Sequence, residues 1–297
     1  MEIALTLVSP QEAAVAAAAV QLTQALAGAH ARVKEPRPLG PGAVDLSVEA
    51  EALAPVRAAV ADALSDLPVD ACVQPWEGRR KRLLIADMDS TIIGCECIDE
   101  LADFAGVKAK VSEITERAMR GELDFEAALR ERVAMLKGLP LSDLQLAYDE
   151  RVVLNPGART LVRTMAAGGA RCVLVSGGFT FFTSRVAQAA GFHAQRANTL
   201  IEDGEVLAGE VGVPILGREA KLTALREEAA AIGAELTATL AVGDGANDLA
   251  MIEAAGLGVA YRAKPVVAAQ AHAKVDHADL TALLYFQGYA ATDFVTD

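Results

Sequence analysis

The sequence predicts an α/β protein with two units: a doubly wound parallel-sheet core interrupted by a helical cap, and before it a small βαββαβ sandwich. Three observations support this prediction. At 297 residues the chain exceeds the usual size of a single domain. Beyond residue 78, short apolar strands alternate with helical stretches, a pattern typical of parallel strands covered on both faces. Each cluster of informative polar residues directly follows such a strand, where open parallel sheets place their sites.

The first 78 residues have the element order of a split-βαβ sandwich. The pattern predicts strands at 2–8, 30–34, 43–48 and 69–73, and helices at 11–27 and 52–65. Pro75-Trp76-Glu77-Gly78 then breaks the pattern, and a basic run from Arg79 to Arg82 follows it. We therefore expect one domain at 1–78 and a second at 79–297.

The second unit contains apolar strands predicted at 82–86, 171–175, 238–242 and 257–260. Roughly 85 residues separate the first two of these strands and have mainly helical patterns. That length is too great for a single crossover connection. We therefore expect an inserted helical cap at about 95–153.

Composition excludes several classes of function. Lys and Arg total 27 against 40 Asp and Glu, and the net charge of −13 disfavours nucleic acid or an anionic membrane as partner. No apolar run approaches the roughly 20 residues that span a bilayer, and the start lacks a basic signal sequence, so we expect a cytoplasmic protein. The four cysteines, Cys72, Cys95, Cys97 and Cys172, form no C-x-x-C pair and are expected to be free thiols.

The first polar cluster contains Asp87 and Asp89, directly after the apolar strand at 82–86. Residues i and i+2 of an extended chain point the same way, so the two carboxylates converge. A divalent cation or a shared proton is needed to hold them together. The alternative is an ordinary acidic turn after a strand.

Two further clusters carry groups that suit a phosphate. Ser176-Gly177-Gly178 offers a hydroxyl and backbone N–H groups that can approach an anion closely, before a helix N-terminus. Lys221, near the start of a predicted helix, offers a positive charge. Each has an ordinary alternative, a strand-to-helix turn for the first and a solvated surface lysine for the second.

The last cluster, Gly243-Asp244-Gly245-Ala246-Asn247-Asp248, supplies hard oxygen ligands suited to magnesium at a strand end. It is not a dinucleotide-binding fingerprint, because Asp248 occupies the position of the third glycine, and the chain has no G-x-x-x-x-G-K-[ST] loop.

Taken in order, these four motifs resemble those of haloacid dehalogenase-type phosphatases. Within that superfamily, Glu96, nine residues after Asp87, and the segment 129–133 resemble the phosphoserine phosphatases. The resemblance covers roughly residues 79–290. The first 78 residues resemble the ACT-type regulatory fold that precedes this catalytic domain in several bacterial relatives, and this likeness implies regulation or a homodimer through that domain.

The resemblance implies an aspartyl-phosphate mechanism with Mg²⁺ as cofactor. Asp87 is then the nucleophile, and Asp89 is first the general acid and then the general base. Asp87, the Asp89 backbone carbonyl and Asp244 are the implied magnesium ligands, with Asp248 in the outer shell. The groups implied to hold the phosphoryl oxygens or orient that side of the site are Ser176, Gly177, Gly178, Lys221 and Asn247.

The implied substrate is phosphoserine, because Arg132 and Glu96 match its carboxylate and ammonium groups. Met119 and Phe125 are the implied apolar shield, although both are equally typical of cap core. Arg132 has the alternative of an exposed helix arginine paired with a neighbouring Glu. Two other functions stay open: a phosphotransferase to homoserine or a sugar phosphatase on the same core, and a non-catalytic amino-acid sensor.

Overall fold

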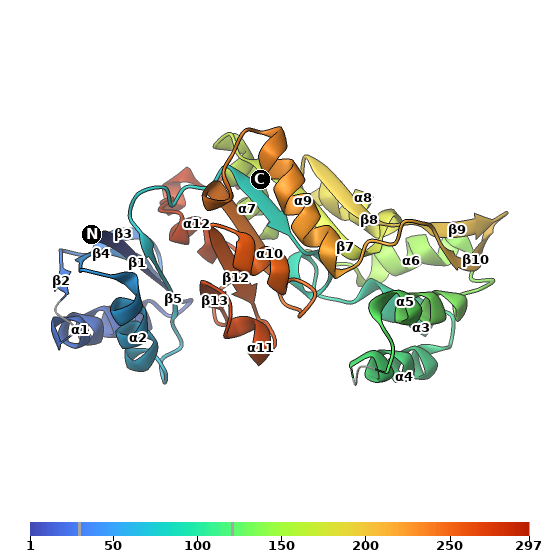
Figure 1. Ribbon diagram of the computed structural model, residues 1–297, viewed down its shortest axis with the longest axis horizontal. Helices are drawn as coiled ribbons and strands as arrows, with labels where there is room; N and C mark the ends of the chain where they lie inside the picture. Colours follow the sequence, from blue (N-terminus) through green and yellow to red (C-terminus); the bar gives the residue numbers. More distant parts are fainter. Residues whose placement is uncertain (29–30, 120–121, 297) are drawn as a thin grey trace.

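The computed structural model describes residues 1–28, 31–119 and 122–296. A small N-terminal sheet lies at one end, a larger parallel sheet in the middle, and a group of helices at the other end (Figure 1). No helix in the described ranges combines the length and the apolar character needed to cross a bilayer.

The N-terminal sheet is antiparallel and has the strand order β2-β4-β1-β5, with β3 also paired to β4. Its elements are β1 (Glu2–Val8), α1 (Glu12–Gly28), β2 (Arg32–Val33), β3 (Arg37–Gly40), β4 (Ala43–Glu49), α2 (Leu53–Ala63) and β5 (Asp70–Pro75). This arrangement confirms the βαββαβ prediction. His30, in the strand predicted at 30–34, lies outside the described residues. Strand β3 was not predicted, because Pro38 interrupts the alternation that marks a strand.

The two faces of this sheet are covered differently. Alternate residues such as Leu5 and Leu46 pack against Leu22 of α1 and Val60 of α2. Because side chains alternate along a strand, the other residues face the opposite way. On that second face Val8, Leu39, Ala43 and Cys72 belong to the hydrophobic core of the larger unit. A small two-layer unit leaves one face of its sheet exposed unless a second copy or the rest of the chain covers it, and in the structure the larger unit does so.

Polar contacts fix this junction. The Asp70 carboxylate, 2% exposed, accepts hydrogen bonds from the backbone N–H groups of Asp276, His277 and Ala278 at 2.7 to 3.3 Å. The buried Gln74 amide donates to the Phe286 carbonyl at 2.7 Å. The N-terminal sheet is therefore joined to the C-terminal end of the chain by groups that are shielded from water.

The larger sheet is parallel throughout, in the order β13-β12-β11-β6-β7-β8. Its strands are β6 (Leu83–Ala86), β7 (Arg171–Phe179), β8 (Ala194–Asn198), β11 (Thr239–Gly243), β12 (Leu257–Tyr261) and β13 (Ala273–Val275). The four apolar strands were predicted. The two edge strands were missed because β8 is largely polar and β13 has only three residues.

Helices cover both faces of this sheet, which confirms the doubly wound prediction (Figure 1). Helices α7 (Ala158–Ala167), α8 (Thr180–Ala190) and α12 (Ala282–Phe286) pack on one face. Helices α9 (Arg218–Ala231), α10 (Leu249–Ala254) and α11 (Pro265–Ala268) pack on the other. Every residue of β6 is buried, so the central strand is an apolar run rather than an alternating one.

The remaining helices lie between Ile93 and Leu154, which pair with each other in an isolated bridge. They are α3 (Cys97–Phe104), α4 (Lys108–Met119), α5 (Phe125–Ala134) and α6 (Leu141–Arg151). We call this group the cap. A hairpin of β9 (Leu200–Asp203) and β10 (Val206–Val211), which was not predicted, reaches from the core to the cap, where Val206 bridges Pro140.

The contribution of Asp70 to this junction can be tested by mutation. In Asp70→Asn an NH₂ group replaces one of the two accepting oxygens and cannot accept from the N–H groups that it then faces, so the free energy of unfolding in urea should fall by about 1.5 to 3 kcal/mol. The exposed Asp66→Asn serves as control and should change it by less than about 0.5 kcal/mol. Equal stability of both variants would show that the Asp70 contacts do not hold the junction.

Candidate active site

The four polar clusters of the sequence meet at the carboxyl ends of the parallel strands. Asp87 follows β6, and its backbone N–H donates to the Val242 carbonyl of β11 at 3.0 Å. Asp244 follows β11, and the neighbouring α9 contributes Lys221. Since parallel strands end at the same edge of the sheet, residues far apart in sequence become neighbours.

At the centre of the site Lys221 lies between two carboxylates. Its Nζ is 2.6 Å from Asp87 Oδ1 and 2.5 Å from Asp248 Oδ1, and all three side chains are buried. Burial alone would lower the pKa of Lys221. The negative charges of Asp248 and Asp87 have the larger effect, and together they raise the pKa of Lys221. Lys221 is thus a buried cation fixed by two acids, which excludes the solvated surface lysine.

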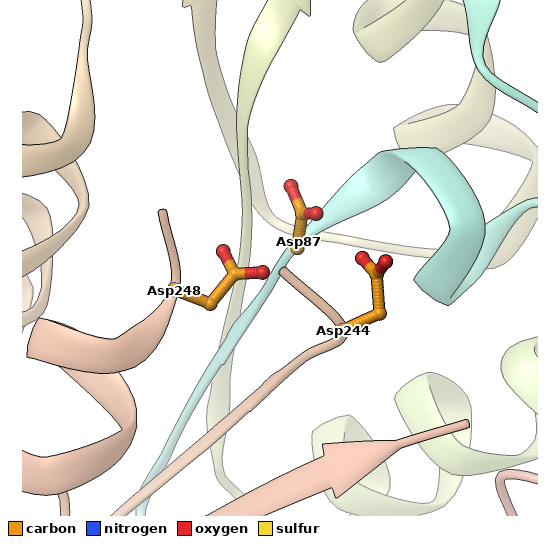
Figure 2. Close-up of side chains that lie close together, drawn as sticks. All are labelled: Asp87, Asp244 and Asp248. Carbon is orange, nitrogen blue, oxygen red and sulfur yellow. The ribbon is translucent and has the colours of Figure 1, made fainter. Parts of the chain in front are cut away.

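A third carboxylate completes the cluster. One oxygen each of Asp87, Asp244 and Asp248 lies within 4.8 Å of the others, and Figure 2 shows the three side chains turned toward a common space. Burial and the neighbouring Asp248 raise the pKa of Asp87, while Lys221 opposes this. Burial and Asp248 likewise raise the pKa of Asp244 to about 6.

This donor set fits a magnesium ion. Three carboxylates supply hard oxygen ligands, and one lysine leaves them with excess negative charge. Thr91 Oγ1 donates to Asp244 Oδ1 at 3.3 Å, which helps orient that acid. Three of the residues predicted to hold the metal, Asp87, Asp244 and Asp248, are therefore close together, and Asp248, predicted for the outer shell, is also held by Lys221.

Asp89 has a different environment from Asp87. Its Oδ1 accepts from the Cys97 N–H at 2.8 Å, and its Oδ2 accepts from Ser176 Oγ at 3.0 Å. Burial raises the pKa of Asp89, and these hydrogen bonds oppose the rise. The carboxyl group faces donors rather than the acid cluster, and its raised pKa favours the protonated form that a general acid needs.

The Ser176-Gly177-Gly178 segment belongs to the end of β7 rather than to a turn, with a shift of register to β8 after Val175. Ser176 Oγ accepts from the Gly178 N–H at 2.8 Å. A Cβ on Gly178 would lie 3.0 Å from both Asp89 Oδ2 and Ser176 Oγ. A side chain at Gly178 would therefore crowd Asp89 and Ser176, which favours glycine at this end of β7.

The cap contributes an arginine, a glutamate and a phenylalanine near the site. A Cβ on Gly177 would be 3.2 Å from Phe125 Cζ, so Phe125 covers the serine-glycine segment. Desolvation lowers the pKa of the half-buried Arg132, while Asp99 and Glu96 oppose this. Desolvation, and then Asp89, raises the pKa of Glu96 to about 7. Arg132 therefore lies among carboxylates of the site.

Two predicted residues are less well defined. Met119 is the last residue of α4, and its side chain lies outside what the structure describes. Asn247 is half-buried, and its Oδ1 would lie 2.3 Å from a Cβ on Gly245, so its side chain folds back over the loop.

Sequence reasoning missed three residues that order the site. Ser90 has a left-handed backbone, φ +57°, and its Oγ donates to Glu96 Oε1 at 2.6 Å. Asn155 Nδ2 donates to the carbonyls of Thr91 and Ile93, tying the end of the cap to the nucleophile loop. Asn198 donates to the Gly177 carbonyl at 2.8 Å. Only Asn155 had a sequence signal, the turn-forming Asn-Pro-Gly at 155–157.

Residues 84–253, more than half of the chain, match the haloacid dehalogenase-like hydrolase family. The chain belongs to this family. A phosphoserine phosphatase of Streptomyces coelicolor is 45% identical over 249 residues, which are 83% of this chain and 60% of that relative. The chain thus spans less than two thirds of the Streptomyces protein.

Two solved structures are similar over different shares of the chain. A probable phosphoserine phosphatase from Vibrio cholerae, in unliganded form, has a TM-score of 0.78 and 30% identity, covering 98% of this chain and 88% of that one. A phospho-aspartyl intermediate analogue of a phosphoserine phosphatase has a TM-score of 0.65 and 37% identity, covering 70% of this chain and 99% of that one.

The buried lysine makes a second prediction. In metal-free protein, Lys221→Met leaves Asp87 and Asp248 without their cation, and unfolding free energy at pH 8 should fall by about 3 to 5 kcal/mol. The loss should shrink toward pH 5, because protonation of Asp87 and Asp244, whose pKa values are already raised, removes the repulsion within the cluster. Lys274→Met, at an exposed ion pair with Asp276, is the control. A loss that is independent of pH would contradict this charge balance.

Proposed function

We propose that the protein is a magnesium-dependent phosphatase that hydrolyses phosphoserine to serine and phosphate. The observation that carries the proposal is the buried contact of Asp87 with the Lys221 cation, two residues before a second buried carboxyl group, Asp89, which accepts from Ser176. The phosphoserine phosphatases among the relatives support the choice of substrate, and the solved phospho-aspartyl analogue supports a covalent intermediate.

In the first step an Asp87 carboxylate oxygen attacks phosphorus. The bond from phosphorus to the serine oxygen breaks, and Asp89 transfers its proton to that oxygen. In the second step Asp89 takes a proton from water, whose oxygen attacks phosphorus, and the bond to Asp87 breaks. Asp89 is protonated again at the end, so the cycle closes.

The phosphoryl oxygens gain charge stabilisation from groups already in place. Lys221 is held within reach of the Asp87 oxygen, and the Ser176 hydroxyl and the Gly177 N–H lie at the adjoining strand end. Asp87, Asp244 and the Asp89 backbone carbonyl would hold a magnesium ion, supported by Asp248. When bound, that ion supplies positive charge against the repulsion between carboxylate and phosphate.

Specificity comes from the cap in this proposal. Arg132 pairs with the substrate carboxylate and Glu96 with its ammonium, while Phe125 covers the bound phosphate. A sugar phosphatase would share the core chemistry but has no need for this charge pair. A phosphotransferase to homoserine would use the same pair, and it is distinguished by the transfer of phosphate to added homoserine instead of its release. An amino-acid sensor without catalysis would not need the assembled acid and lysine cluster.

We also propose that residues 1–78 form a regulatory or dimerisation domain beside a catalytic domain at 79–297, in a cytoplasmic enzyme. The first 78 residues contribute none of the acid, lysine or serine groups of the site. Their sheet nevertheless shares apolar core with the catalytic unit, so the two domains are expected to stabilise each other.

The mechanism is tested by Asp87→Asn, which keeps the shape but removes the attacking charge. Phosphate release from phosphoserine should fall to background, with the fold retained by circular dichroism. In the unaltered protein a chelator should abolish phosphate release, and added Mg²⁺ should restore it. Substantial turnover by the Asn variant would rule out Asp87 as nucleophile.

The substrate assignment is tested by Arg132→Ala. The loss of a charge-assisted contact costs about 1.5 to 3 kcal/mol, so kcat/KM for phosphoserine should fall roughly tenfold to hundredfold. An aryl phosphate that lacks a carboxylate should be hydrolysed as before. Arg130→Ala, an exposed neighbour that reaches Glu126 at 3.9 Å, is the matched control. An equal loss of kcat/KM on both substrates would show that Arg132 stabilises the cap instead of binding the substrate carboxylate.

The domain division is tested with a chain that begins at Arg79. It should bind magnesium and hydrolyse phosphoserine, because every proposed catalytic group is retained. Its melting temperature should fall, since the Phe286 side chain, the Phe286 carbonyl and the N–H groups of 276–278 lose their partners. If this chain does not fold or is inactive, the N-terminal unit completes the catalytic fold.

A further inference from the structure

A hollow of about 360 Å³ lies at the junction of the two units, and none of its residues takes part in the proposed reaction. It is lined by Arg37 of β3, the segment that follows β5, and the end of α12: Arg37, Trp76, Gly78, Arg79, Arg80, Gln287 and Gly288. Figure 1 shows this junction and the cap on opposite sides of the parallel sheet. The hollow is therefore separate from the acid cluster.

Positive charge exceeds negative charge around the hollow. Asp45, whose side chain is fully buried, accepts from Arg37 and from Arg79 through the same oxygen, each at 2.8 Å. Its other oxygen is taken by Thr6 at 2.7 Å. Arg80 approaches Asp293 only at 3.6 Å and stacks on Tyr289. Three arginines thus face two carboxylates, in a protein whose net charge is −13.

These arginines retain unused hydrogen-bond donors. A guanidinium carries five N–H groups, and Arg79 Nη1 is buried with no hydrogen-bond partner among the described residues. The side chains of Arg37 and Arg80 are 52% and 60% exposed, so their free donors can reach a solute. A buried donor without an acceptor costs about 1 to 3 kcal/mol, which a bound acceptor would recover.

The hollow has a fixed shape around a tryptophan. The Arg79 guanidinium lies 4.3 Å from the centre of the Trp76 ring and the Arg37 guanidinium lies 5.8 Å from it. Gly288 has φ +79°, and a Cβ there would lie 2.5 Å from Arg79 Nη2, so glycine is needed to seat the arginine. Residues of the Pro75 to Gly78 segment and the arginines that follow it therefore line the same hollow.

We infer that this hollow binds a small oxyanion, a phosphate or a carboxylate group, that accepts hydrogen bonds from the arginine guanidinium groups. Planar guanidinium groups suit both anions because they can donate two parallel hydrogen bonds. A hollow of about 360 Å³ has room for an anion as small as phosphate or a carboxylate group. Since both units line the hollow, a bound anion joins them.

The single tryptophan of the chain allows a direct test. Metal-free full-length protein is titrated with inorganic phosphate, and separately with acetate, at constant ionic strength set by chloride. We expect a saturable change in Trp76 emission at millimolar concentration with at least one of them. Saturation by phosphate alone or by acetate alone identifies the anion class. A change that does not saturate, or that chloride reproduces, would overturn the inference.

Variants separate this site from phosphate bound at the acid cluster. Arg80→Gln and Arg37→Gln, both at exposed side chains, should weaken the apparent affinity at least tenfold without changing phosphoserine hydrolysis in the absence of added anion. Arg82→Gln is the matched control, because Arg82 donates to the carbonyls of Ile232 and Gly233 and does not line the hollow. An emission change that persists unaltered in Arg80→Gln and Arg37→Gln would place the anion elsewhere.

Discussion

The ion pairs of Lys221 with Asp87 and Asp248 are the interaction on which the rest of the site depends. Three carboxylates converge within 4.8 Å, and such a group cannot stay ionised in a buried place without positive charge. Lys221 supplies one charge and leaves room for a divalent cation. The same contact that offsets the negative charge of the cluster also fixes the carboxylate of Asp87, the proposed nucleophile.

Asp87 and Asp89 are only two residues apart, but their side chains have different surroundings. Asp87 contacts the Lys221 cation, which opposes the rise of the Asp87 pKa caused by burial and by Asp248. Asp89 instead accepts from the Cys97 N–H and the Ser176 hydroxyl, and burial raises its pKa. The parallel sheet makes this possible because β7 and β11 end on either side of β6. A cation beside one carboxyl group and neutral donors beside the other are the two environments that the proposed nucleophile and general acid need.

The sequence predicted the central strands and the residues that gather at their ends, because buried apolar runs and the polar clusters after them are local patterns. It could not predict the edge strands β8 and β13, whose pairing depends on neighbours rather than on composition. It also could not show that the second face of the N-terminal sheet is covered by the catalytic unit, since that choice rests on distant partners such as Asp70 and Ala278. The left-handed backbone of Ser90 had no signal at all.

The account is tested most directly by locating the phosphoryl group during turnover. The protein is mixed with phosphoserine and magnesium, quenched in acid and treated with borohydride, which reduces an acyl phosphate of aspartate to homoserine. Peptide mass spectrometry should find homoserine at position 87 and intact aspartate at positions 89, 244 and 248. Homoserine at another of these positions, or unmodified Asp87 in a sample quenched during steady turnover, would contradict the account.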